Sequence, residues 1–269
     1  MNGAIRGRID GREVTVERDT TILQAARGLG LAIPTLCHHP GLPDEGSCRL
    51  CLVEIAFGDQ TGKLVASCMY PLRDNDFDIS TDNGEVRSAR AFVLELLISR
   101  CPSSPRLLAL ACAYGVQPEP RFSGPFERSS AENGRRSKPA RIEPESGLCL
   151  LCGRCSRACE INGTSAISMV GRGRKRVAVG PFYQAPDDCV GCLACASVCP
   201  TGAIKAEEAS GLRRIWGREF VLIQCQSCGE EFAAREQLHF LSLGGELCPG
   251  CRRREMASAL NEAQRFSSN

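Results

Sequence analysis

Apolar and polar positions alternate with a period of two over the first part of the chain, which predicts short strands around one helix. Asp10-Gly11 lies between two such runs and is a hairpin signal. A loop rich in glycine and proline separates the helix from two further strands. Hairpin, helix, loop and strands in this order predict a β-grasp fold. The predicted elements are strands 5–9 and 13–16, a helix that Thr20 or Thr21 caps and that ends near Arg27, Gly28 and Gly30, and strands 50–55 and 63–66.

Helical spacing replaces strand spacing over residues 85–99, which predicts a core helix with Asp82 and Glu85 as a capping box. Residues 118–139 are rich in proline, serine, glycine and arginine and predict a surface linker. Residues 252–266 predict an amphipathic terminal helix. The apolar positions are Val86, Ala89, Val93 and Leu96 in the first helix, and Met256, Leu260 and Ala263 in the second.

Composition narrows the class of protein. The chain has 269 residues, 43% of them hydrophobic and 24% charged, with a net charge of +2, which is typical of a globular protein without a polyanionic partner. Aromatic residues are only 5%, which disfavours single-strand nucleic-acid binding. The N-terminus lacks an apolar signal segment, and the longest apolar run, 107–116, is too short to span a membrane. We therefore expect a cytoplasmic protein, in which 18 cysteines indicate metal centres rather than disulfides.

Two cysteine quartets share the spacing C-x2-C-x2-C-x3-C and form an internal repeat 40 residues apart. Three thiolates at three-residue intervals can hold three corners of a cubane, and the fourth reaches the other cluster. The repeat therefore predicts two [4Fe–4S] clusters, with a pair of zinc sites as the alternative. Glu160 stands where this pattern usually has proline, as it does at Pro200. The predicted ligand sets are Cys149, Cys152, Cys155 and Cys199 for one cluster, and Cys189, Cys192, Cys195 and Cys159 for the other.

A third quartet lies in the loop and strands of the predicted β-grasp domain, and we assign it to a [2Fe–2S] cluster. Small loop residues there allow backbone N–H groups to approach the cluster sulfurs. His38 and His39 permit a Rieske-type alternative, but four cysteines are available, so we expect both histidines to lie at the rim. The predicted ligands are Cys37, Cys48, Cys51 and Cys68.

The fourth quartet has the spacing C-x2-C-x19-C-x2-C, which is typical of a zinc ribbon. A closed site with four thiolates has no open coordination position, so its expected role is to stabilise a small domain. Another Fe–S cluster is the alternative. The predicted ligands are Cys225, Cys228, Cys248 and Cys251.

The stretches 35–40, 46–54 and 66–68 resemble the N-terminal domain of one protein family, the large iron–sulfur subunit of respiratory complex I and its counterparts in NAD-linked hydrogenases and NAD-dependent formate dehydrogenases. The predicted two-cluster segment also has a place in that family. The middle of the chain departs from it, because the family's motif of one histidine and three cysteines is missing. Cys101 and Cys112 remain there; we expect buried apolar side chains, with a metal shared with a partner as the alternative.

The basic residues do not indicate a binding surface. The run 171–176 predicts a solvated hairpin tip rather than a nucleic-acid or docking patch, and it lacks the third glycine of a dinucleotide fingerprint. Four filled sites would shift the formal charge from +2 to about −6, so Arg49, Arg154 and Arg157 are interpreted as local compensation. No catalytic constellation is recognisable, so we expect no active site.

The sequence thus predicts an α+β protein: a β-grasp [2Fe–2S] ferredoxin domain, a helical linker region, a bacterial-type 2[4Fe–4S] ferredoxin domain and a C-terminal zinc ribbon. The resemblance implies an electron-transfer subunit between a flavin-containing NAD(P)H-oxidising subunit and a second catalytic redox subunit. A free polyferredoxin carrier and an Fe–S redox-sensing regulator are the alternatives. The predicted divisions are 1–82, 83–140, 141–208 and 209–269.

Overall fold

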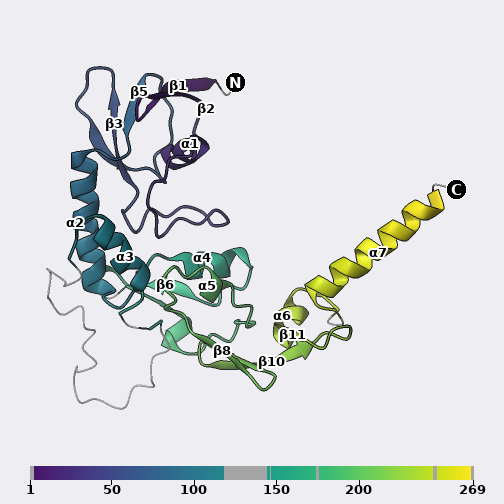
Figure 1. Ribbon diagram of the computed structural model, residues 1–269. Helices are drawn as coiled ribbons and strands as arrows, with labels where there is room; N and C mark the ends of the chain where they lie inside the picture. Colours follow the sequence, from purple (N-terminus) through teal and green to yellow (C-terminus); the bar gives the residue numbers. More distant parts are fainter. Residues whose placement is uncertain (1–2, 118–143, 146, 174–175, 245–246, 268–269) are drawn as a thin grey trace, which may run out of the picture.

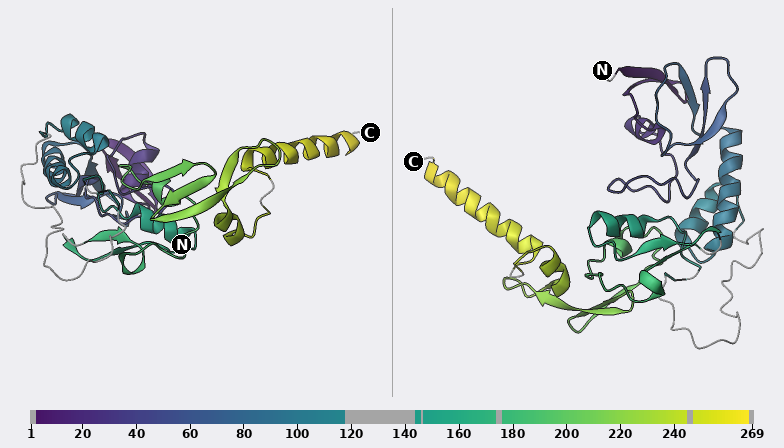
Figure 2. Two further views of the ribbon diagram at one scale, coloured as in Figure 1. Left: turned by 90° about the horizontal axis from the view of Figure 1, so that it is seen from below. Right: turned by 180° about the vertical axis from the view of Figure 1, so that it is seen from behind.

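The computed structural model describes residues 3–117, 144–145, 147–173, 176–244 and 247–267. Figure 1 shows a small β-sheet unit at the top, a pair of helices at its side, and a mixed unit below that continues into a C-terminal sheet and a long helix. The views of Figure 2 show the same arrangement, with the last helix extending away from the rest. The predicted linker 118–139 lies outside the described residues.

The N-terminal unit has the predicted β-grasp fold. Its five-stranded sheet has the order β2-β1-β5-β3-β4, in which β1 and β5 are parallel and the other pairs antiparallel. Of the two predicted caps, Thr20 and Thr21, it is Thr21 that caps the helix, through a capping box with Gln24. The elements are β1 (Ala4–Ile9), β2 (Arg12–Glu17), α1 (Ile22–Gly28), β3 (Leu52–Phe57), β4 (Lys63–Ala66) and β5 (Phe77–Ser80).

Two helices, α2 (Gly84–Arg100) and α3 (Pro105–Ala113), follow the sheet, and α2 was predicted at nearly these bounds. The predicted capping box is wrong, because Asn83 accepts the Val86 N–H while Asp82 pairs with Arg87. The predicted buried face is also partly wrong, since Leu96 is 40% exposed. The residues that α2 buries are four apart: Val86, Arg90, Leu94 and Ile98.

The repeat region forms two short helices, each directly after a cysteine-bearing turn. An antiparallel pair of strands lies between them, which confirms the predicted hairpin; residues 174–175 lie outside the described residues, and Arg176 pairs with Glu45 of the β-grasp loop. The elements are α4 (Arg154–Ile161), β6 (Ser168–Val170), β7 (Val177–Val179), the 3-10 helix η2 (Pro181–Tyr183) and α5 (Ala194–Ser197).

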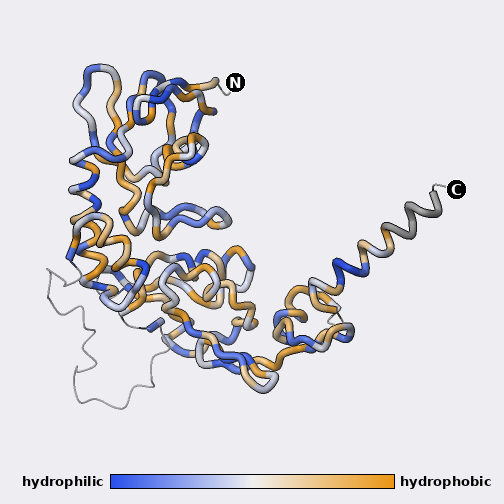
Figure 3. Tube along the Cα trace, in the orientation of Figure 1, coloured by the Kyte–Doolittle hydropathy of each residue, from blue (hydrophilic) through white to orange (hydrophobic). Residues whose placement is uncertain are grey.

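The C-terminal region begins with a four-stranded antiparallel sheet in the order β11-β10-β9-β8, which runs from the repeat region to the last cysteine quartet. Helix α7 matches its predicted position, and its side chains Met256 and Leu260 are exposed. Figure 3 shows a strongly hydrophilic turn near the start of α7, at Arg252–Arg254. The elements are β8 (Ala206–Ala209), β9 (Leu212–Ile215), β10 (Arg218–Gln224), β11 (Glu231–Ala234), α6 (Arg235–Phe240) and α7 (Pro249–Ser267).

One apolar core joins three parts of the chain and contains cysteines of two quartets. Leu36 and Cys37 of the β-grasp loop pack with Leu94 of α2 and with Cys152 of the repeat region. The β-grasp loop therefore packs directly against the repeat region. In the described part of the chain, no helix has the length and apolarity that crossing a membrane requires.

Candidate metal centres

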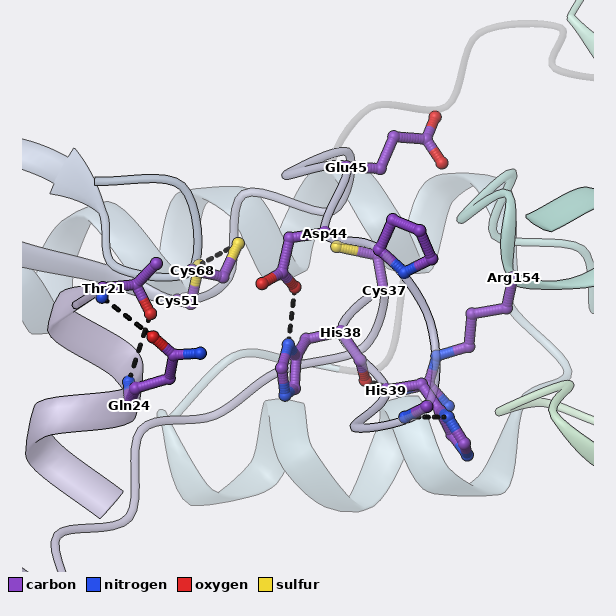
Figure 4. Close-up of polar contacts among 12 residues, drawn as sticks. Thr21, Gln24, Cys37, His38, His39, Asp44, Glu45, Cys51, Cys68 and Arg154 are labelled. Carbon is purple, nitrogen blue, oxygen red and sulfur yellow. Dashed lines mark hydrogen bonds and ion pairs between the residues drawn. The ribbon is translucent and has the colours of Figure 1, made fainter. Parts of the chain in front are cut away.

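The first quartet lies where the β-grasp loop meets the sheet, and all four thiols are buried. Cys51 and Cys68 Sγ are 3.4 Å apart, and the Cys48 N–H donates to Cys37 Sγ over 3.5 Å. Figure 4 shows Cys37 and the Cys51–Cys68 pair on the loops beside α1. The structure thus brings the four predicted ligands together. Cys68 comes from the segment that follows β4.

The two histidines beside Cys37 are engaged elsewhere. His38 Nδ1 lies 2.5 Å from Asp44 Oδ1, and its Nε2 lies 2.6 Å from the Arg27 guanidinium, which can only donate. His39 Nδ1 accepts the Gly41 N–H. Figure 4 shows the His38–Asp44 contact at the edge of the loop. Both rings therefore have partners other than the four thiols.

The quartet fits a metal cluster on its own chemistry. The hydrogen bond between the Cys51 and Cys68 sulfurs lowers the pKa of Cys51 to about 6, against the effect of burial. The buried hydroxyl of Ser67 has no nitrogen or oxygen partner and lies beside the Cys51 thiol. A buried hydroxyl that can donate to the Cys51 sulfur, and that has no other partner, suits a site whose sulfurs carry negative charge.

The repeat region holds two cavities, and each is lined by cysteines from both repeats. Three consecutive thiols of one turn meet the fourth cysteine of the other repeat in each case. Burial raises the pKa of Cys152 to about 11 and that of Cys195 to about 12, so thiolates there need the positive charge of a metal. The first pocket contains Cys149, Cys152, Cys155 and Cys199, and the second pocket contains Cys189, Cys192, Cys195 and Cys159.

The two cysteine-bearing turns share one backbone shape. In the first turn Leu151 and Gly153 have positive φ, 55° and 68°. In the second turn Gly191 and Leu193 have positive φ, 68° and 62°. Each turn thus needs two left-handed residues, and glycine and leucine have exchanged places between the repeats.

The helices after the turns differ in length for a reason visible in the sequence. Pro200 lacks an N–H and follows the second helix, α5, which ends at Ser197. Glu160 at the equivalent position lets α4 continue to Ile161. The departure from the usual pattern therefore lengthens the helix and leaves Cys159 lining the second pocket.

Two arginines of α4 join the first pocket to the β-grasp loop. The Arg157 guanidinium donates to the carbonyl oxygens of Cys37, at 2.8 Å, and Cys152, at 3.0 Å. It also contacts Pro43 O and pairs with Glu45 at 3.3 Å. Arg154 donates to His38 O and reaches toward that loop in Figure 4. One side chain thus touches the backbone of a ligand candidate in both centres, a more specific contact than the charge compensation predicted from sequence.

The C-terminal sheet covers the second pocket. Trp216 Nε1 donates to Cys195 Sγ at 3.3 Å, and Arg213 donates to Gly191 O at 2.6 Å. Phe220, fully buried, lies so close that a Cβ on Gly191 would be 2.7 Å from its ring. The sequence did not predict that this sheet covers the second pocket. The only signal was that Trp216 is the sole tryptophan of the chain.

The four cysteines of the fourth quartet lie close together in the structure. All four Sγ atoms lie within 4.8 Å of one another, and Cys228 and Cys248 Sγ are 3.8 Å apart. The Cys248 N–H donates to Cys225 Sγ over 3.2 Å and lowers the pKa of Cys225 to about 6. Tetrahedral Zn–S bonds of about 2.3 Å separate the sulfurs by about 3.8 Å, so this spacing suits a single metal ion better than a cubane.

The two remaining cysteines differ. Cys101 is fully buried in the core shared by Cys37 and Cys152, as predicted. Cys112 is exposed, so the prediction of a buried side chain is wrong there. Sequence reasoning also missed Arg90, which is 2% exposed and donates to the carbonyl oxygen of Leu52, directly after Cys51. A charged residue on an apolar helix face was the available signal.

Comparison with known families agrees with this geometry. Residues 3–84 match the family model described as a 2Fe-2S iron-sulfur cluster binding domain, and residues 140–206 match a 4Fe-4S dicluster domain. The chain is therefore an iron–sulfur protein that combines these two kinds of cluster-binding domain.

Its relatives confirm the resemblance to iron–sulfur subunits of NAD(P)H-linked oxidoreductases. The chain is 33% identical to NADP-reducing hydrogenase subunit HndD of Solidesulfovibrio fructosivorans, over 74% of this chain and 36% of that protein. It is 31% identical to the NADH-ubiquinone oxidoreductase 75 kDa subunit of Reclinomonas americana over 77% of this chain and 30% of that protein. The chain thus spans between a quarter and two fifths of the length of these relatives.

A solved structure gives the same relationship. A chain of an NAD+-reducing [NiFe]-hydrogenase in the H2-reduced state matches with a TM-score of 0.58 and 27% identity. The match covers 74% of this chain and 86% of that one.

Proposed function

We propose that this chain is an electron-relay subunit of a multisubunit NAD(P)H-linked oxidoreductase. The observation that carries the proposal is the continuous contact between centres. Arg157 joins the backbone of Cys37 to that of Cys152, and Cys159 and Cys199 each pass from one repeat to the pocket of the other. Three cysteine constellations are thereby connected within one folded unit.

The proposed cofactors are one [2Fe–2S] cluster in the β-grasp quartet and one [4Fe–4S] cluster in each of the two pockets, with the ligand sets predicted from sequence. When bound, these clusters accept and donate single electrons. The chain's own residues bind and bury them. Leu151, Ala203 and Ile204 line the first pocket with apolar surface, and Ile167, Ile215 and Trp216 do so in the second. Such apolar lining excludes water from the two pockets.

For the fourth quartet we propose one structural zinc ion. The mutual Sγ spacing below 4.8 Å and the direct connection of β10 to Cys225 support a role in fixing the end of the sheet. No open coordination position is expected there.

The proposed partners are a flavoprotein that oxidises NAD(P)H and a second catalytic redox subunit, in a hetero-oligomer. Support comes from relatives that are named as subunits, including the NADPH-Fe(3+) oxidoreductase subunit alpha of Geobacter sulfurreducens, which is 30% identical over 82% of this chain and 26% of that protein. A free carrier remains the competing function, and native purification separates the two. A relay subunit elutes with a flavoprotein at fixed stoichiometry, whereas a carrier elutes alone.

Metal and sulfide analysis of anaerobically purified protein tests the cofactors. The proposal expects about 10 iron, about 10 sulfide and about one zinc per chain, with EPR signals of one [2Fe–2S] and two [4Fe–4S] centres after reduction. About 14 iron without zinc would contradict the zinc assignment. Absence of either [4Fe–4S] signal would contradict the relay.

A further inference from the structure

The only tryptophan of the chain lies against a ligand candidate of the second pocket. Trp216 is 6% exposed, and its indole N–H donates to Cys195 Sγ over 3.3 Å. Among the described residues, no side chain donates a hydrogen bond to the equivalent sulfur of the first pocket, Cys155, whose pKa burial and neighbouring thiols raise. The two pockets therefore differ at the same position of the repeat.

The backbone holds this indole in an unusual conformation. Ile215 pairs with Arg218, so Trp216 and Gly217 form a two-residue hairpin loop between β9 and β10. Both loop residues have positive φ, 54° and 71°, as this kind of turn requires. Glycine and asparagine are the usual choices there, and a bulky side chain in this region strains the backbone. A tryptophan at such a strained position points to a use for its side chain.

The β9–β10 hairpin is held against the turn that bears Cys189 and Cys192. These contacts keep the Trp216 indole next to Cys195 Sγ. Arg213, in β9, donates to Gly191 O at 2.6 Å, and Arg218, in β10, donates to Pro186 O at 2.9 Å. Phe220 packs against Gly191 from the same hairpin. Three side chains thus hold β9 and β10 on residues 186–191, on either side of the Trp216 contact.

We propose that Trp216 is a positioning residue that raises the reduction potential of the second [4Fe–4S] cluster by hydrogen bonding to Cys195 Sγ. Reduction adds negative charge that the cluster shares with its thiolate ligands, and a donor N–H stabilises that charge. The indole also keeps water from this sulfur. The inference rests on the proposed ligand set of the second pocket.

Substitution of the indole by an aromatic ring without an N–H tests the hydrogen bond. In Trp216→Phe we expect the one-electron reduction equilibrium of one [4Fe–4S] cluster to fall about threefold to tenfold, which is a shift of about 30 to 60 mV to more negative potential in an anaerobic EPR titration. The other [4Fe–4S] cluster and the [2Fe–2S] cluster should keep their midpoints. Val221→Ala is the matched control, because Val221 is a 40% exposed side chain of the same strand, and its midpoints should match the wild type.

Labelling provides a test without any substitution. Because the chain has one tryptophan, tryptophan labelled with 15N at the indole nitrogen places a single label in the protein. Pulsed EPR of the reduced protein should detect coupling between this nitrogen and one [4Fe–4S] cluster.

The outcomes distinguish a failure of the role of Trp216 from a failure of the ligand assignment of the second pocket. Equal midpoint shifts in Trp216→Phe and Val221→Ala, no shift in Trp216→Phe, or no 15N coupling would each overturn the role of Trp216 while both clusters are present. Fewer than two [4Fe–4S] clusters per chain in the wild type would overturn the ligand assignment itself, and this inference with it.

Discussion

The two halves of the cysteine repeat have the same ligand spacing and the same turn shape, yet different parts of the chain cover them. The first turn is covered by the β-grasp loop, which Arg157 holds through the carbonyl oxygens of Cys37 and Cys152. The second is covered by the C-terminal hairpin, which Arg213 holds through Gly191 O. Ligand geometry is therefore a property of the repeat, whereas the surroundings of each centre come from the domains on either side.

The largest expected effect tests whether the halves exchange their fourth ligands. Cys155→Ala and Cys199→Ala should remove the same [4Fe–4S] EPR signal, because both side chains line the first pocket. Cys159→Ala should remove the other signal, although Cys155 and Cys159 lie on the same helix. Iron content should fall by up to about four per chain in each variant. Loss of the same signal in Cys155→Ala and Cys159→Ala would contradict the crossed arrangement.

The next effect concerns the residue that attaches the first half to the β-grasp loop. Arg157→Met keeps the length of the side chain but removes its hydrogen bonds to two buried carbonyls and the pair with Glu45. We expect a loss of about 4 kcal/mol in the free energy of unfolding, because the side chain is 10% exposed and charged. Anaerobic denaturation followed by cluster absorbance measures it.

The equivalent position in the second half supplies the control for that substitution. Ser197 is exposed, and its hydroxyl contacts only the Ala194 carbonyl in the described structure. Ser197→Ala should leave the unfolding midpoint unchanged. A comparable loss in both variants would mean that the two halves are attached in the same way.

The next smaller effect on stability compares the glycine of each turn that faces its covering segment. Gly191→Ala would bring Cβ within 2.7 Å of the Phe220 ring at φ 68°, so we expect a loss of about 3 kcal/mol in the free energy of unfolding. In Gly153→Ala the nearest atoms belong to the Glu45 carboxylate, the end of a flexible side chain, so we expect about 1 to 2 kcal/mol.

A double variant tests the cause of that difference. Phe220→Leu should recover part of the loss in Gly191→Ala, because the clash lies in the ring. Additive losses from the two substitutions would contradict the packing explanation.

The smallest effect compares adjacent arginines in the second cover. Arg213→Met removes hydrogen bonds to Gly191 O and Glu208, both at 2.6 Å, from a side chain that is 7% exposed, so about 2 kcal/mol should be lost. Arg214→Met changes the net charge equally, but Arg214 is exposed, and the unfolding midpoint should not move. Equal shifts in the two variants would indicate that charge, rather than the contact with the turn, matters.

The parts of the fold that depend on local sequence were predictable. The strand alternation, the Thr21 cap and the hairpin at the basic run follow from neighbouring residues. The start of α2 shows the limit of this approach, since Asp82 and Asn83 both suit a helix cap, and backbone geometry alone decides that Asn83 accepts the Val86 N–H.

Long-range contacts could not be predicted. The sequence places Arg90 on an apolar helix face, but it does not name the Leu52 carbonyl as the acceptor, because that contact depends on tertiary packing. Trp216 is 21 residues from Cys195 and belongs to a different part of the fold, so its contact exists only through the register of β9 and β10. Ligand types and spacing are local properties, whereas the side chains that surround a centre come from tertiary packing.

The exchange of glycine and leucine between the two turns limits how the repeat can be rebuilt. Each turn keeps glycine at the position where its own cover approaches, Glu45 at Gly153 and Phe220 at Gly191, and carries leucine at the other left-handed position. A protein engineer who transplanted one half into the place of the other would preserve every cysteine and still present a leucine side chain to the incoming domain. The two halves are interchangeable as ligand donors, but they are not interchangeable as building blocks.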